Sequence, residues 1–131
     1  MIRAMSKHQE FLNREYRTSE HLALSTSPSE DLQKFTRFLE RRTGRKHLNP
    51  TALALDLGCG NGRNLIYLSQ AFAMRGLGYD VSDVAIDQAL QLTGDLPIQY
   101  EVRSISEPLP LRDASVTLAL DMMTSHFLRA A

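Results

Sequence analysis

The sequence predicts an α/β protein, in which short strands pair into a parallel sheet with flanking helices. Two apolar runs, 51–57 and 116–120, lack polar alternation, as is typical of parallel strands buried on both faces. Apolar side chains at helical spacing follow the first run, and glycine, proline or asparagine separates the segments. Strands and helices that alternate in this way form parallel sheets with right-handed crossovers.

An N-terminal helical segment, residues 1–49, is expected to precede the sheet. Apolar side chains at loosely helical spacing predict a first helix over residues 6–24. The run Ser27-Pro28-Ser29-Glu30 is typical of a helix start, with Ser27 as the N-cap and Glu30 completing a capping box. An apolar stripe then predicts a second helix, which Gly44 is expected to end.

Residues 50–131 are expected to form the α/β unit, because Asn49-Pro50 breaks the chain before it. Its elements are expected in the order strand 51–57, helix 63–74 closed by Gly76, strand 76–80, helix from Ser82 to Thr93, strand 98–102 and strand 116–120. Ser82 is a favoured N-cap, and Asp83 suits the positive end of the helix that follows.

Composition limits the class of protein. The 131 residues suffice for one domain, and 15 Lys and Arg balance 15 Asp and Glu. Balanced charge argues against a broad surface for nucleic acid, although a local basic patch is still compatible with it. We interpret Arg41-Arg42 and Arg45-Lys46 as a solvated helix end. No stretch approaches the ~20 apolar residues of a membrane span, and no signal peptide is evident. A cytoplasmic protein without a membrane partner is expected.

No metal site is expected. The single cysteine, Cys59, excludes an internal disulfide and a cysteine metal cluster, and His8, His21 and His47 lack the spacing of metal ligands. Cys59 is a weak candidate for a nucleophile, because the sequence places no histidine beside it.

A glycine-rich turn, Asp56-Leu57-Gly58-Cys59-Gly60-Asn61-Gly62, joins the first strand to the next helix. Glycines let the backbone approach a ligand, and the helix N-terminus offers free N–H groups, so this turn predicts a nucleotide site. The dinucleotide fingerprint requires glycine where Arg63 stands, which disfavours a nicotinamide-dependent oxidoreductase.

Residues 55–64 resemble the first motif of the class I, Rossmann-like S-adenosylmethionine-dependent methyltransferases. The resemblance extends over residues 27–128 and implies strands one to four of the family's usual seven. It therefore implies an incomplete sheet, from a truncated, incomplete, split or domain-swapped protein. The exposed edge of strand four would then be open to self-association.

The resemblance implies a set of cofactor-binding residues. In the family the glycine loop cradles the amino-acid part and ribose of S-adenosylmethionine, which here implies Asp56, Gly58, Cys59, Gly60, Asn61 and Gly62. Asp80, 24 positions after Asp56, matches the acid that binds the ribose hydroxyls, and Val81 matches the apolar contact with adenine.

The carboxyl ends of strands three and four complete the implied site. Many relatives have an aspartate at position 105 for the adenine amino group, and Ile105 cannot replace it, so Ser104, Ser106 or backbone groups are the candidates. Asp121 is expected near the methionine end of the cofactor. His126 is either a general base or a solvent-exposed side chain near a helix start.

The resemblance implies methyl transfer from S-adenosylmethionine to an unidentified acceptor, which we expect to be a small molecule. The sulfonium already activates the methyl group, so a base is needed only where the acceptor must lose a proton. The alternative is a non-catalytic cofactor-binding or interaction fragment.

Overall fold

The computed structural model describes residues 26–104, 106, 108 and 115–121. The predicted helix 6–24, Ile105 and His126 lie outside these residues. The described elements follow in the order α2 (Glu30–Thr43), β1 (Leu53–Leu57), α3 (Arg63–Phe72), β2 (Arg75–Asp80), α4 (Asp83–Thr93), β3 (Ile98–Val102) and β4 (Leu118–Leu120).

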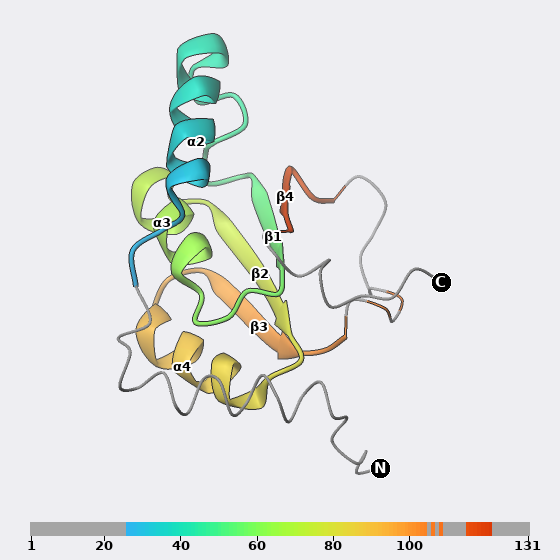
Figure 1. Cartoon of the computed structure of the whole chain (residues 1–131). Helices are drawn as coiled ribbons and strands as arrows, with labels where there is room; N and C mark the ends of the chain where they lie inside the picture. The colour runs from blue at the N-terminus through green and yellow to red at the C-terminus, as the bar shows by residue number, and fades with distance from the viewer. Residues whose placement is uncertain (1–25, 105, 107, 109–114, 122–131) are drawn as a thin grey trace.

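The four strands form one parallel sheet in the order β3-β2-β1-β4, which confirms the predicted fold class (Figure 1). In register, Leu55 of β1 lies between Leu77 of β2 and Ala119 of β4. From β1 the chain adds β2 and β3 on one side, and it later adds β4 on the other. The strand order therefore reverses between β1 and β4, and open α/β sheets bind ligands at such a switch point.

Helices α3 and α4 cover the same face of the sheet (Figure 1). Right-handed crossovers require this, because both β1-α3-β2 and β2-α4-β3 advance in one direction. The inward side chains Leu65 and Leu68 of α3 and Ala89 of α4 are almost completely buried. Within the described residues, no helix combines the length and apolar character that a membrane span requires.

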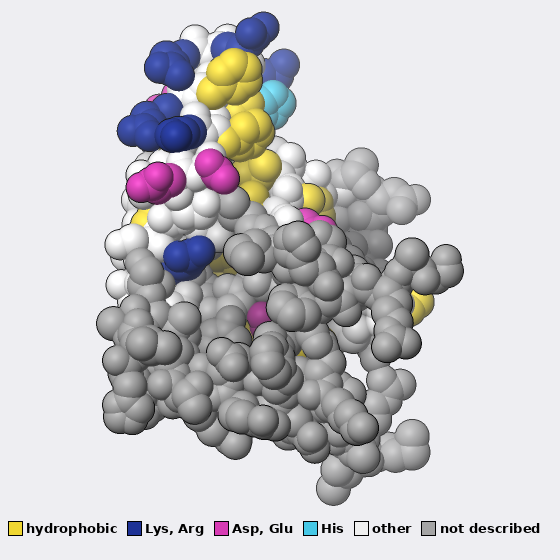
Figure 2. Space-filling view, viewed as in Figure 1, with side chains coloured by type: hydrophobic (Ala, Val, Ile, Leu, Met, Phe, Trp, Pro, Cys, Tyr) yellow, Lys and Arg dark blue, Asp and Glu magenta, His cyan; other side chains and the backbone are white. Residues whose placement is uncertain are grey.

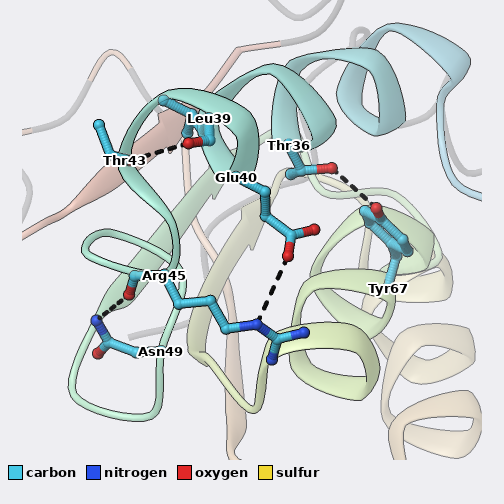
Figure 3. A network of polar contacts seen from close by, with 7 residues as sticks. All are labelled: Thr36, Leu39, Glu40, Thr43, Arg45, Asn49 and Tyr67. Atoms are coloured by element: carbon cyan, nitrogen blue, oxygen red, sulfur yellow. Dashed lines mark hydrogen bonds and ion pairs between the residues drawn. The ribbon is translucent and has the colours of Figure 1, made fainter.

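Helix α2 packs against α3 and extends beyond the end of the sheet (Figure 1). Leu32 and Thr36 on its inner side are 2% and 0% exposed. The hydroxyl groups of Thr36 and Tyr67 are 2.8 Å apart across the two helices (Figure 3). Leu32 and the loop residue Leu48 belong to the same hydrophobic core as the sheet, so α2 is part of this core.

The structure corrects the start of α2. The predicted capping box is wrong, because Ser29 rather than Ser27 is the N-cap and its side chain makes no capping hydrogen bond. Instead, the backbone N–H of Ser29 donates to Asn64 Oδ1 at 2.9 Å, which ties the beginning of α2 to α3. Gly44 ends the helix as predicted, and its N–H donates to Glu40 O.

The end of α3 and the extents of two strands also differ from the prediction. Helix α3 ends at Phe72, and Ala73, rather than a glycine, adopts the left-handed conformation that closes it. Gly76 lies inside β2, where its lack of a side chain leaves room for Ile98: a Cβ there would come within 3.1 Å of it. Strands β1 and β4 begin two residues later than expected, whereas Ser82 caps α4 as predicted.

Candidate functional site

The predicted site residues lie at one edge of the sheet. All strands are parallel, so their carboxyl ends meet at that edge. The glycine loop follows β1, Asp80 ends β2 and precedes Val81, Ser104 follows β3, and Asp121 follows β4. Of the predicted site residues, only Ile105 and His126 lie outside the described part of the chain.

The glycine loop is a tight turn that depends on left-handed backbone. Gly58, Gly60 and Gly62 have φ angles of 81°, 56° and 82°, where a side chain costs roughly 1–2 kcal/mol per residue. The N–H groups of Gly58 and Cys59 both donate to Tyr79 O, at 2.7 and 2.9 Å. The loop is thus fastened to β2 before it enters α3.

Asp80 is a second fastening point between the loop and β2. Its Oδ2 accepts from the N–H of Gly60, and its Oδ1 accepts from the N–H of Ser82, both at 2.9 Å. The side chain is 6% exposed. A carboxylate offers about four acceptor positions, so its two oxygens can bond several donors at once. Asp80 therefore both shapes the glycine loop and faces the edge at which a ligand would bind.

Asp56 lies beneath the loop in a negative environment. Its side chain is 2% exposed, and burial raises the pKa of its carboxyl group to about 7. The neighbouring Asp80 raises this pKa further and Asp121 adds to the effect, whereas Arg63 opposes it. Three carboxyl groups from three strands thus interact at the switch point, and their potential favours a cationic ligand group.

Cys59 has the environment of a packing residue. It is 6% exposed, and burial, with a contribution from Asp56 and Asp80, raises the pKa of its thiol well above the ordinary value. The thiolate is the nucleophilic form of cysteine, and this environment suppresses it. No group of three or more metal-ligating side chains occurs among residues whose positions are described.

Tyr100 and Thr93 support the glycine loop from below, and sequence reasoning missed this pair. Their hydroxyl groups are 2.6 Å apart, and a Cβ added to Gly62 would overlap the Tyr100 hydroxyl. Gly78 lies opposite Tyr100 in register, and a Cβ there would come within 2.7 Å of the ring. A glycine in the middle of a strand was the available signal, since it often marks close approach of a neighbour.

Ser104 is half-buried after β3 and interacts with its neighbour. Its Oγ lies 2.7 Å from Ser106 Oγ and accepts from the N–H of Ser106 at 3.2 Å. The segment is joined to the acidic part of the site, because the N–H of Arg103 donates to Asp80 O at 2.9 Å. Polar groups are thus present beside position 105.

This fold and site define an α/β domain of the Rossmann-like, nucleotide-binding class. A family model described as methyltransferase domain matches residues 54–131, and the chain belongs to this family of class I S-adenosylmethionine-dependent methyltransferases. The described strands β1–β4 correspond to the N-terminal half of that fold.

Solved structures share the fold. An S-adenosylmethionine-dependent methyltransferase from Thiobacillus denitrificans, in complex with S-adenosyl-L-homocysteine, aligns with a TM-score of 0.66 and 20% identity over 90% of this chain and 46% of its own. A putative S-adenosylmethionine-dependent methyltransferase from Listeria monocytogenes aligns with a TM-score of 0.58 and 26% identity over 72% of this chain and 42% of its own. The chain thus spans less than half the length of either protein.

A curated relative is similar over part of its length. An uncharacterized 37.1 kDa protein in transposon TN4556 of Streptomyces fradiae is 40% identical over 81 residues, which cover 59% of this chain and 23% of that protein. The chain thus spans about a quarter of the length of this relative.

Proposed function

We propose that this chain binds S-adenosylmethionine at the carboxyl edge of its sheet and transfers the methyl group to an acceptor. The observation that carries the proposal is the interaction of the glycine loop with Asp80 at the edge where Asp56 and Asp121 also lie. The loop and the acids come from different strands, yet together they form one arrangement of backbone and carboxylate groups. This arrangement is suited to a sulfonium cation that carries an adenosyl group.

Each part of the site has a proposed role. The glycine loop, including Cys59 and Asn61, accommodates the amino-acid part and ribose through its backbone. The Asp80 carboxylate accepts hydrogen bonds from the ribose hydroxyls, and Val81 contacts the adenine face. Asp56 and Asp121 attract the positively charged methionine end, since opposite charges nearby favour the ionised carboxylate.

Recognition of adenine is proposed to use Ser104 and Ser106 or nearby backbone, because Ile105 has no acceptor in its side chain. The cofactor supplies a methyl group already activated by the sulfonium. The chain has to orient the methyl acceptor, exclude water and, where the acceptor carries a proton, remove it. His126 is proposed for that last role, and a small-molecule acceptor stays our prediction.

Calorimetric titration with S-adenosylmethionine tests the proposal. We expect Asp80→Ala to lose at least about tenfold in affinity, because it removes both the ribose acceptor and a loop fastening. Asp87→Asn, an exposed acid on α4, is the matched control and should bind like the parent. Absence of binding to the parent chain contradicts the proposal. Binding without transfer of a labelled methyl group favours the alternative of a non-catalytic fragment.

Self-association through β4 is a separate part of the proposal. Among the described strands, β4 pairs with β1 alone, and unpaired strand edges are templates for pairing with another chain. Sedimentation equilibrium over a range of concentrations tests it, and a monomer at every concentration contradicts it.

A further inference from the structure

A local excess of positive charge lies on α2 and the loop that follows it. Residues 34–47 contain six Lys or Arg and a single acid, Glu40, although the whole chain has no net charge. Figure 2 shows these dark blue side chains gathered at the end of the molecule that α2 forms. This charge lies away from the carboxyl edge of the sheet, and the proposed function does not use it.

The helix presents most of these cations on one face. Leu32, Thr36 and Leu39 turn toward the core, so with 3.6 residues per turn the opposite side faces solvent. We call that side the α2 basic face; all its members are exposed, and they are Lys34, Phe35, Arg37, Phe38, Arg41 and Arg42. The two phenylalanines are 42% and 45% exposed, so aromatic rings alternate with cations.

Within the described residues, the cations of this face form no ion pairs. Arg45, which lies outside the face, does have structural partners. Its Nε lies 3.6 Å from Glu40 Oε2 (Figure 3). Its guanidinium also stacks over the Phe72 ring. Lys34, Arg37 and Arg41 make no ion pair with any acid in the described part of the chain. Arg42 stacks over the Phe38 ring at 5.4 Å, which holds a cation and an aromatic side chain together.

We propose that the α2 basic face binds single-stranded nucleic acid. Guanidinium groups match phosphate oxygens in geometry and charge, and exposed aromatic rings stack on unpaired bases. Proteins that bind single strands combine cationic groups for the phosphates with aromatic rings for the bases, and this face carries both. Phosphates and bases are common to RNA and DNA, so the two kinds of strand share the recognising chemistry.

A membrane surface fits this face less well. Helices that lie in a membrane interface insert a wide apolar side. The apolar side of α2 is turned inward, with Leu32 only 2% exposed. Two phenylalanines among four cations suit stacking on bases better than insertion into acyl chains.

The beginning of α2 is the part of this face that lies nearest to the proposed cofactor site. The beginning of α2 is tied to the beginning of α3, which the glycine loop enters, by Ser29 N–H to Asn64 Oδ1. The 14-residue helix is about 21 Å long, so a strand of several nucleotides would span it. The proposal does not require that the bound strand is the methyl acceptor.

Fluorescence anisotropy with a labelled RNA of about 15 nucleotides, at roughly 50 and 200 mM salt, tests the proposal on the full chain. We expect binding that weakens with salt, because phosphate contacts release counterions. Arg37→Gln and Arg41→Gln should each weaken binding several-fold and reduce the salt slope by about one. Phe38→Ala should weaken binding about fivefold or more with the slope unchanged. Arg75→Gln removes an exposed Arg on β2 and should bind like the parent.

Further binding measurements distinguish single-stranded nucleic acid from other ligands of this face. A DNA strand of the same sequence should bind comparably, whereas a duplex should bind more weakly and should not respond to Phe38→Ala. The proposal is overturned if the parent binds no single strand at the lower salt concentration, if the face variants bind like Arg75→Gln, or if phosphatidylserine vesicles are preferred. Titration of the variants with S-adenosylmethionine keeps this outcome distinct from the proposed function, since the face does not contact that site.

Discussion

Asp56 is a buried carboxyl group that opposes folding at the proposed cofactor site. Burial and the neighbouring acids hold its pKa at about 7, far above its ordinary value of 3.8. Between these two pH values the folded chain binds a proton that the unfolded chain releases. Stability therefore falls as pH rises from about 4 to about 7 and then levels off. Active-site groups commonly carry such a cost.

The isosteric change Asp56→Asn tests this at the scale of one residue. It removes the titrating group, so we expect its stability advantage over the parent to grow by about 2 kcal/mol or more between roughly pH 5 and pH 8. Urea unfolding of both proteins across this range measures the difference. Parallel pH profiles for the two proteins would show that Asp56 titrates normally in the folded chain.

At the scale of elements, the sequence predicted strands and helices better than their ends. The strands were predictable because apolar runs and alternation reflect burial. The start of α2 was not predictable from the sequence, because the hydrogen bond from Ser29 N–H to Asn64 Oδ1 depends on how the two helices pack. The sequence predicts Gly76 as a helix end, whereas in the structure it makes room for Ile98 of the next strand. The basic face of α2 also needed the structure, since it depends on which side of the helix is buried.

The turn from β1 into α3 depends on packing against β3 as well as on its glycines. Gly62 has left-handed αL backbone, with φ of 82° and ψ of 6°. A Cβ on Gly62 would overlap the Tyr100 hydroxyl. We expect Gly62→Ala to cost clearly more stability than the roughly 1–2 kcal/mol that the left-handed backbone alone imposes on a side chain.

A double-mutant cycle isolates the packing part of that cost. In a Tyr100→Phe background, which lacks the hydroxyl, the penalty of Gly62→Ala should fall toward the roughly 1–2 kcal/mol cost of the left-handed backbone alone. Chemical denaturation of the four proteins in the cycle gives these free energies. An unchanged Gly62→Ala penalty in the Tyr100→Phe background would mean that the loop moves away from β3 without cost.

Two groups of like charge lie apart within the described residues, although the charges of the whole chain sum to zero. Asp56, Asp80 and Asp121 lie at the carboxyl edge of the sheet, and the cations of the α2 basic face lie away from it (Figure 2). The sequence predicted the loop and acids of this edge because each follows a strand, and parallel strands bring such positions together. It could not show that Asp80 holds Gly60 or that Tyr100 supports Gly62, because those contacts join segments through side-chain packing.

The proposed function predicts the direction in which cofactor affinity changes with pH. Asp56 is largely protonated below about pH 7 in the empty site, and the ammonium and sulfonium cations of the methionine part favour its ionised form. Affinity for S-adenosylmethionine should therefore rise as pH increases from about 6 to about 8, and Asp56→Asn should flatten the profile. Adenosine lacks the amino-acid part and is the matched ligand control, with no such rise. Calorimetric titrations at each pH measure both ligands, and an equal rise for adenosine would place the titrating group away from the methionine end.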